Sequence, residues 1–312
     1  MVNANFTQAD PLPSWNDGEV KRSIFTFVQS VADQNGPDHV PTAARIAVFD
    51  NDGTLWAEQP LYIQLAFAFD RVKALAPEHP EWRNTQPFQA VLEGDYKALA
   101  AAGMKGVLEL VTATHSGMTS DEFDRIARDW FATARHPRFN RPNTELAYQP
   151  MVELLAYLRA NGFKTYIVSG GGIEFMRAIS EQLYGIPPEQ VIGSSGKTRY
   201  ELRGGMPVIV RQPELDFFDD KEGKPLAIQK FIGRRPIAAF GNSDGDLQML
   251  QWTATGAGRR LMLLVDHTDA EREFDYRVSP MGRLEVALQE AQQRGWTVVS
   301  MKDHWKRIFA FE

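Results

Sequence analysis

The sequence predicts an α/β fold, in which a parallel β-sheet carries helices on both faces and an all-helical segment is inserted into the chain. Three observations lead to this prediction. Short apolar, β-rich runs alternate with helical patterns, which is the order typical of a parallel sheet. Several of these runs end abruptly in acidic or polar residues, as strands do at the ligand-binding edge of open α/β sheets. Residues 57–144 contain successive helical patterns and no convincing strand.

The strands are predicted from apolar runs that are short and bounded by polar or turn-forming residues. These runs cover residues 46–49, 165–168, 236–240 and 261–265. A further apolar run lies near the end of the chain, at residues 296–301. Two β-like runs between Val191 and Gln212 flank Gly204-Gly205, which predicts a β-hairpin.

Helices of the same domain are predicted from apolar residues at helical spacing. Asn16 and Glu19 have the spacing of a capping box, and apolar residues then recur at helical intervals to Val31. Later helical patterns cover residues 150–160, 173–183 and 284–294. We therefore assign residues 1–56 and 145–312 to an α/β core domain.

Residues 57–144 are interpreted as a helical cap domain inserted into this core. Apolar periodicity predicts helices over residues 61–76, 88–101, 105–115 and 120–134. Thr119 and Glu122 have the spacing of a capping box at the start of the last helix. The aromatic residues of the segment are expected to form the core of the bundle rather than a ligand cage.

The composition narrows the class of protein. The chain has 312 residues, with 34 basic and 40 acidic side chains and a net charge of -6. No long basic run is present, so neither nucleic acid nor a membrane is expected as a partner. Cysteine is absent, which excludes disulfides, thiolate metal sites and cysteine nucleophiles. Residues 1–10 have no signal-peptide pattern and no run is long enough for a transmembrane helix, so we expect a soluble chain whose compartment, cytoplasmic or periplasmic, stays open.

The apolar run over residues 46–49 leads directly into two acids, Asp50 and Asp52. In an extended chain these side chains point to the same side, before Gly53 and Thr54 turn the chain away. Two carboxylates in one small volume repel each other unless a cation or a shared proton intervenes, so the pair predicts Mg²⁺, a raised pKa on one acid, or both. A calcium loop of the EF-hand type, which D-x-D-G resembles at its start, is disfavoured because a Leu-Trp pair follows.

The six residues that begin at Asp50, D-N-D-G-T-L, resemble motif I of the haloacid dehalogenase superfamily of phosphatases, whose pattern is D-x-D-x-T after a strand. The strand that ends in Ser169 resembles motif II of this superfamily. The Ser169 hydroxyl and the backbone N–H groups after it are suited to bind a phosphoryl oxygen. A tight glycine turn without a ligand is the alternative at this position. Motif III requires a lysine, for which Lys224 is the best candidate and Lys221 and Lys230 are competitors.

Motif IV resembles Gly241 to Asp246, but here Asn242 replaces the first acid of the pattern G-D-x-x-x-D. An asparagine can bind Mg²⁺ through its carbonyl oxygen but brings no charge. We therefore expect either weaker metal affinity or a larger contribution of Asp244 and Asp246 to metal binding. The same departure is compatible with a non-catalytic protein of this fold that binds a ligand without turning it over.

The resemblance implies phosphoryl transfer through an aspartyl-phosphate. Asp50 is the expected nucleophile, and Asp52 is expected to protonate the leaving alkoxide and then to activate water. Mg²⁺ is expected to be held by a carboxylate oxygen of Asp50, the backbone carbonyl of Asp52 and Asn242, with Asp246 in or just outside the coordination sphere. Lys224 is expected to neutralise a further oxygen of the phosphate.

The resemblance also indicates where a substrate binds. Thr54, Ser169 and Gly170 are expected to contact the phosphate. The inserted helices are similar to the helical (C1) cap of the phosphoserine-phosphatase-like branch, which has a Rossmannoid core and closes over small substrates. Glu58 is a candidate for a substrate ammonium, and an acid at a helix start without such a role is equally compatible. We expect hydrolysis of a small phosphorylated metabolite, with phosphate transfer between small molecules as the alternative; the substrate and the oligomeric state stay open.

Overall fold

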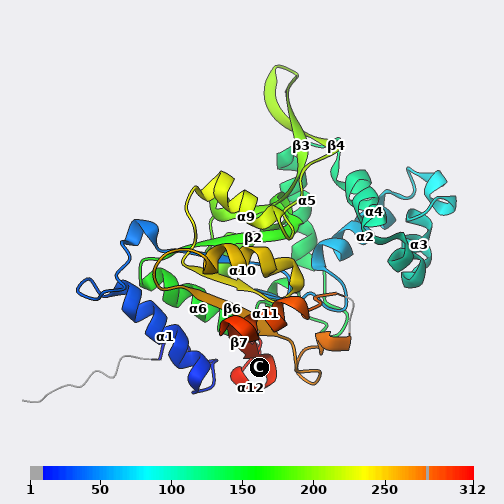
Figure 1. Cartoon of the computed structure of the whole chain (residues 1–312). Helices are drawn as coiled ribbons and strands as arrows, with labels where there is room; N and C mark the ends of the chain where they lie inside the picture. Colours follow the sequence, from blue (N-terminus) through cyan, green and yellow to red (C-terminus); the bar gives the residue numbers. More distant parts are fainter. Residues whose placement is uncertain (1–9, 279–280) are drawn as a thin grey trace, which may run out of the picture.

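The computed structural model describes residues 10–278 and 281–312, and these residues form a seven-stranded sheet in the order β4-β3-β2-β1-β5-β6-β7 (Figure 1). All neighbouring strands are parallel except β3 and β4. The strands are β1 (Ile46–Phe49), β2 (Lys164–Gly172), β3 (Val191–Arg203), β4 (Met206–Phe217), β5 (Ala238–Gly241), β6 (Leu261–Asp266) and β7 (Thr297–Ser300). The predicted parallel sheet is confirmed, and the final apolar run forms its edge strand β7.

The prediction that residues 1–10 form no signal peptide falls almost wholly outside the described residues. In the part of the chain that is described, no helix is both long and apolar enough to cross a membrane.

Strand β1 lies at the centre of the sheet, and all four of its residues are buried. It pairs with β2 on one side and with β5 on the other. The chain thus builds the sheet outward in one direction through β2 and β3, and in the opposite direction through β5, β6 and β7. Open α/β sheets bind ligands at the carboxyl ends of strands where the order reverses in this way.

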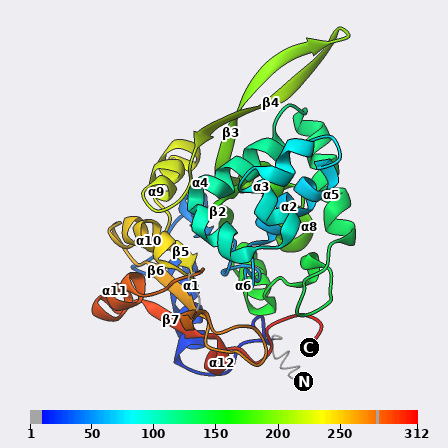
Figure 2. The same cartoon turned by 90° about the vertical axis from the view of Figure 1, so that its right-hand side faces the viewer.

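Helices cover both faces of the sheet, as predicted. One face packs against α1 (Glu19–Ala32), α6 (Gln149–Ala160), α7 (Ile173–Arg177), α8 (Ser180–Tyr184) and α12 (Met301–His304). The other face packs against α9 (Gly223–Ala227), α10 (Leu247–Ala254) and α11 (Val286–Arg294), which lie together on one side in Figure 2. Alternate residues of β1 serve the two faces: Ala47 and Phe49 belong to the first cluster and Ile46 and Val48 to the second.

The inserted segment contains α2 (Ile63–Leu75), α3 (Phe88–Glu93), α4 (Tyr96–His115) and α5 (Ser120–Thr133). Its predicted break after residue 101 corresponds to Gly103, which leaves helical geometry within α4 at φ 56°. A further break at Gly94, whose φ is 70°, was not predicted. Phe67 and Phe123 pack into the cluster on the sheet, whereas Trp82 and Phe88 belong to a separate cluster farther out.

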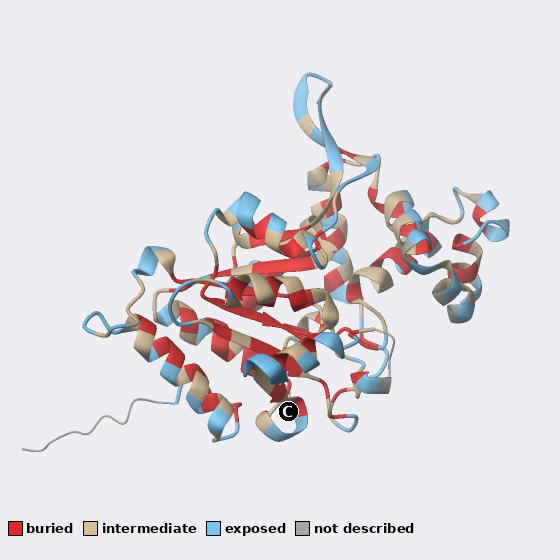
Figure 3. Ribbon diagram, in the orientation of Figure 1, coloured by how far each residue is buried: buried red, intermediate tan, exposed pale blue. Residues whose placement is uncertain are grey.

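The predicted hairpin is longer than expected and extends away from the sheet. Strands β3 and β4 turn at Gly204 and Gly205, whose φ values of 57° and 83° favour glycine. The distal half of the hairpin is largely exposed (Figure 3). Its base is joined to the turn between α4 and α5, because the Gly117 N–H donates to Arg211 O and the Arg211 N–H donates to Met118 O, each over 2.9 Å. The core sheet and the inserted helices are therefore linked by backbone hydrogen bonds.

Candidate active site

Asp50 is the first residue after β1, and it stays in register with the neighbouring strand. Its backbone N–H donates to Phe240 O of β5 over 2.9 Å. The pairing of Phe49 with Phe240 places Asp50 beside Gly241, at the start of the loop that carries Asn242. The Asp50 side chain is only 9% exposed. The two predicted acidic motifs thus meet at the carboxyl ends of adjacent strands.

Lys224 reaches this point from the first turn of α9. Its Nζ lies 2.8 Å from Asp50 Oδ1 and 2.6 Å from Asp246 Oδ1, and its side chain is 2% exposed. The competing lysines lie elsewhere: Lys221 is exposed, and Lys230 is exposed with its Nζ over the Phe231 ring. The structure therefore brings together the lysine and the two acids that the motifs single out.

The buried charges shift one another's protonation. Burial and the nearby Asp246 carboxylate raise the pKa of Asp50 above its ordinary value, against the opposing influence of Lys224. Burial alone lowers the pKa of Lys224, but the carboxylates of Asp246 and Asp50 outweigh it and raise that pKa, so the ammonium stays charged. The group is an ion cluster in which the acids outnumber the base.

Both carboxylate oxygens of Asp246 accept hydrogen bonds from other groups of the protein. Its Oδ1 accepts from Lys224, and its Oδ2 accepts from the backbone N–H groups of Asn242 and Ser243, each over 3.0 Å. These contacts suit a residue that holds Lys224 and the loop in place. Asp244 lies off the site, because its Oδ1 accepts from the N–H groups of Glu285 and Ala287 at the start of α11.

Asn242 is fixed from both sides by a chain of hydrogen bonds. The Thr54 hydroxyl donates to Asn242 Oδ1, and Asn242 Nδ2 donates to Glu58 Oε1, each over 2.9 Å. Burial and the charges of Asp52 and Asp50 raise the pKa of Glu58 well above its ordinary value. An aspartate at position 242 would place a second carboxyl group against Glu58, whereas the amide donates a hydrogen bond to it.

Asp52 faces the second predicted motif. The indole N–H of Trp56 donates to Asp52 Oδ1 over 2.8 Å. A Cβ at Gly171 would lie 3.5 Å from both Asp52 Oδ2 and Ser169 Oγ, so the acid and the serine hydroxyl border the same space beside Gly171. Burial raises the pKa of Asp52 to about 6, although the Trp56 hydrogen bond and the Lys224 charge oppose this.

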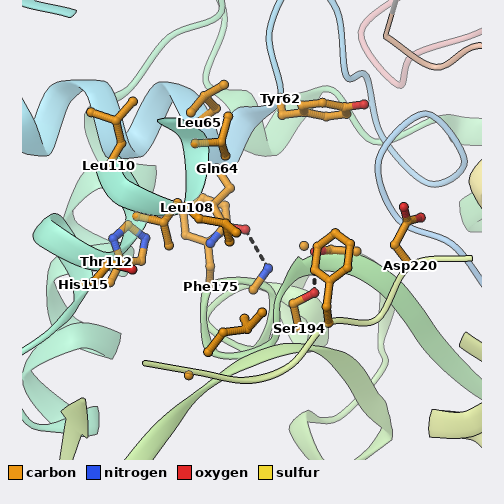
Figure 4. Close-up of a pocket in the computed structure, with 18 of the residues that line it drawn as sticks. Tyr62, Gln64, Leu65, Leu108, Leu110, Thr112, His115, Phe175, Ser194 and Asp220 are labelled. Atoms are coloured by element: carbon orange, nitrogen blue, oxygen red, sulfur yellow. Dashed lines mark hydrogen bonds between the residues drawn. The ribbon is translucent and has the colours of Figure 1, made fainter. Parts of the chain in front are cut away.

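A cavity of about 920 Å³ opens above these residues, between the inserted helices and the strand ends (Figure 4). Six predicted site residues line it: Asp50, Asp52, Glu58, Ser169, Gly170 and Lys224. Thr54, Asn242 and Asp246 are buried and lie behind them. We call Asp50, Asp52, Ser169 and Lys224 the floor of the cavity. Its wall is formed by apolar residues of the insertion: Leu65 and Phe69 on α2, and Val107 and Val111 on α4.

Several residues near the floor were missed by sequence reasoning. His267 Nε2 donates to Gly53 O over 2.7 Å and holds the motif I turn, where Gly53 has a φ of 75° and a Cβ would lie 2.1 Å from Asn242 Nδ2. Asp219 and Asp220 precede α9, and burial raises the pKa of both, that of Asp219 to about 7. No local sequence pattern indicates that His267, Asp219 and Asp220 lie near the floor, because the histidine has no second histidine at a metal-binding spacing and the two acids lie in a polar loop.

The residues present fit Mg²⁺ in their chemistry. In the described part of the chain no three histidine or carboxylate side chains cluster as a metal site. The donors implied by the motifs are instead a carboxylate oxygen of Asp50, the carbonyl of Asp52 and Asn242 Oδ1, all oxygens of the kind Mg²⁺ takes together with water. A carbonyl oxygen has two lone pairs, so Asn242 Oδ1 can accept from Thr54 and still bind a cation. The excess of buried acids over Lys224 also favours a cation here.

The fold is shared with solved structures of low sequence identity. A conserved protein of unknown function from Anaerococcus prevotii DSM 20548 is 17% identical, with a TM-score of 0.58 over 93% of this chain and 94% of that chain. A protein of unknown function from Bordetella pertussis Tohama I is 16% identical, with a TM-score of 0.51 over 82% of this chain and 98% of that chain. No curated protein sequence matches the chain. Residues 47–251 match the family model of haloacid dehalogenase-like hydrolases, and the chain therefore belongs to this family.

Proposed function

We propose that this hydrolase is a Mg²⁺-dependent phosphatase that acts on a small phosphomonoester through a phosphorylated Asp50. The observation that carries the proposal is the direct contact of Lys224 with the buried carboxylates of Asp50 and Asp246 at the floor of a cavity. Burying two acids with one base adds little to stability. A carboxylate nucleophile for phosphoryl transfer, by contrast, needs a fixed cation beside it.

The contacts of each floor residue support a distinct role. Lys224 holds Asp50 Oδ1, which leaves Oδ2 to attack phosphorus. The raised pKa of Asp52, about 6, suits an acid that protonates the leaving alkoxide and later accepts a proton from water. Ser169 and Gly170 border the cavity and are suited to the phosphate oxygens. Thr54 and Asp246 support the site from behind, through Asn242 and Lys224.

The metal would be held by the Asp50 carboxylate, the Asp52 carbonyl and Asn242 Oδ1, with Asp246 just outside its coordination sphere. When bound, Mg²⁺ supplies the positive charge that allows a carboxylate to approach a phosphate dianion. Glu58 brings a carboxyl group beside Asn242, which has none, and accepts a hydrogen bond from the Asn242 amide. This contact supports a role for Glu58 beside the metal site, in place of the predicted contact with a substrate ammonium.

We also propose that residues 57–144 form a cap domain over a core of residues 1–56 and 145–312, in the manner of the phosphoserine-phosphatase-like branch. The position of the cavity between α2, α4 and the strand ends supports this division. A cap of this kind excludes water from the reacting phosphate.

Hydrolysis of 4-nitrophenyl phosphate, with Mg²⁺ and with a chelator, tests the proposal. Turnover is expected only with the metal, and Asp50→Asn is expected to lower it by on the order of 10⁴-fold. Asp244→Asn is the matched control, since this acid caps α11 away from the cavity and its loss should leave turnover unchanged. Unchanged turnover in Asp50→Asn would contradict the proposal, and phosphorylation of an added alcohol would identify a phosphotransferase instead.

A further inference from the structure

The cavity is large for the leaving group of a small polar metabolite. Its volume of about 920 Å³ is near the upper end of the range of roughly 300–1,000 Å³ seen for sites that enclose drug-sized ligands. Figure 4 shows Leu65 and Leu110 of the inserted helices on one side of the space, and Ser194 of the core on the other. The phosphate end at Asp50 takes up only one part of this space.

Most of the remaining lining is apolar. Leu65, Phe69, Val107 and Val111 come from the inserted helices, and Phe175 comes from α7 of the core. Surfaces of this kind favour carbon over hydroxyl or ammonium groups, because a polar group buried against them loses its hydrogen bonds to water. The body of the substrate therefore meets hydrocarbon on several sides.

Apolar side chains also reach the cavity where it is open to solvent. Leu215 at the end of β4 is 47% exposed, and Phe218 just beyond it is 38% exposed. Both line the cavity, although large apolar side chains are usually covered in a folded chain. A ligand with an extended apolar body would cover them.

Several polar side chains that line the cavity are already paired within the protein. Gln64 Oε1 accepts from the Gly172 N–H over 2.6 Å (Figure 4). The Arg211 guanidinium lies 2.6 Å from the Glu174 carboxylate, and its Nε donates to His115 O over 2.7 Å. Hydroxyl groups of a sugar, or the charged groups of an amino acid, would have to disrupt these pairs to gain Gln64 or Arg211 as a partner.

From this lining we infer the substrate class: the phosphate monoester of a bulky apolar alcohol, aryl or long-chain alkyl, rather than a phosphorylated amino acid or sugar. The inference rests on the proposed function, because it takes Asp50 as the phosphate end of the cavity. Hydrolysis of such an ester transfers the phosphoryl group to Asp50 and then to water, and releases the alcohol with the proton from Asp52.

The first test compares kcat/KM with Mg²⁺ for ethyl, butyl and octyl phosphate, phosphoserine and glucose 6-phosphate. We expect an increase of about two- to fourfold per methylene, which places octyl phosphate at least about 60-fold above ethyl phosphate. A higher kcat/KM for phosphoserine or glucose 6-phosphate than for octyl phosphate overturns the inference but leaves the proposed function intact. If neither these five esters nor 4-nitrophenyl phosphate is hydrolysed, the proposed function fails, and binding alone decides the inference.

The binding test uses ethyl and octyl phosphonate without metal, measured by calorimetry. Octyl phosphonate is expected to bind more tightly than ethyl phosphonate by a similar factor and with a negative heat-capacity change, since apolar surface is buried. Equal affinities would overturn the inference.

Variants of α4 connect this preference to the wall. Val107 and Val111 line the cavity and lie outside the buried clusters of the described residues. Val107→Asn and Val111→Asn are each expected to lower kcat/KM for octyl phosphate by about tenfold, and that for ethyl phosphate by less than about twofold. Ala113→Asn, at an exposed position of the same helix, is the matched control. An equal loss on both esters would contradict the role of this wall.

Discussion

The floor and the wall of the cavity are built in opposite ways. The floor carries three charged side chains and one hydroxyl, and its central contact joins residues far apart in sequence, Lys224 with Asp50 over 2.8 Å. The wall consists of apolar side chains on helices, such as Val107 and Val111, that make no polar contact. A change in the floor should therefore alter chemistry with every substrate, whereas a change in the wall should alter which substrate reacts.

Replacement of Lys224, the positively charged side chain of the floor, should have the largest effect on turnover and stability. Lys224→Met leaves the buried carboxylates of Asp50 and Asp246 facing each other without a base. We expect turnover to fall to background and the free energy of unfolding to fall by about 3–5 kcal/mol, measured by urea denaturation without metal. Lys230→Met, an exposed lysine nearby, should change stability by less than about 0.5 kcal/mol. Equal stability of the two variants would show that Lys224 is not needed to balance the acids.

Replacement of the second floor acid should separate chemistry from folding. Asn at position 52 can still accept from the Trp56 indole, so Asp52→Asn is expected to fold normally. Turnover of ethyl phosphate should fall by about 10²–10⁴-fold, because the alkoxide loses its proton donor. The fall should be smaller for 4-nitrophenyl phosphate, whose leaving group needs no proton. Equal losses on both esters would argue against Asp52 as the acid.

Asp219 provides a test of how much a buried carboxylate beside the floor destabilises the folded protein. Burial raises its pKa to about 7, so the folded protein binds this proton more tightly than the unfolded chain does. The resulting stability is present below pH about 4 and is lost as the pH rises toward 7. Asp219→Asn is therefore expected to be more stable than the wild type at pH 8, by about 4 kcal/mol, and to differ from it by only about 1 kcal/mol at pH 4.5.

Denaturation by urea at the two pH values measures this difference. Asp216→Asn is the matched control, because Asp216 is an exposed acid three residues earlier. A stability difference for Asp219→Asn that is the same at both pH values would show that the buried carboxylate does not titrate as expected.

The smallest effect is expected from a change in the insertion that does not touch the cavity. The Thr119 hydroxyl accepts from the Glu122 N–H, and the Glu122 carboxylate accepts from the Thr119 N–H, so the predicted capping box is formed. Thr119→Ala should lower the free energy of unfolding by about 1 kcal/mol and leave kcat for 4-nitrophenyl phosphate unchanged. A fall in kcat would show that the helices of the insertion and the floor are coupled.

The floor could be predicted from the sequence to the extent that its signals are local. The spacing of Asp50 and Asp52 after an apolar run, and the position of Lys224 before the last acidic motif, identified residues that the structure brings together. The contact of Glu58 with Asn242 could not be predicted, because it joins residues 184 positions apart. No pattern along the chain indicates such a partner.

The same limit applies to the fold. Asn16 and Glu19 have the spacing of a capping box, but that prediction is wrong: α1 begins at Glu19, and the Asn16 amide donates to Asp303 O over 2.7 Å. Thr119 and Glu122, with equal spacing, form the box. The helix predicted over residues 173–183 is interrupted between α7 and α8, at Ala178 and Ile179. Tertiary contacts decide between such outcomes, and they are not visible in local spacing.

The two hydrogen bonds between Arg211 and the turn at Gly117 and Met118 have a mechanical consequence. They tie the turn between α4 and α5 to β4, so a displacement of these helices relative to the sheet would have to displace β4 or break both hydrogen bonds. The stiffness of the edge strand therefore adds to the helix packing in holding the inserted segment in position.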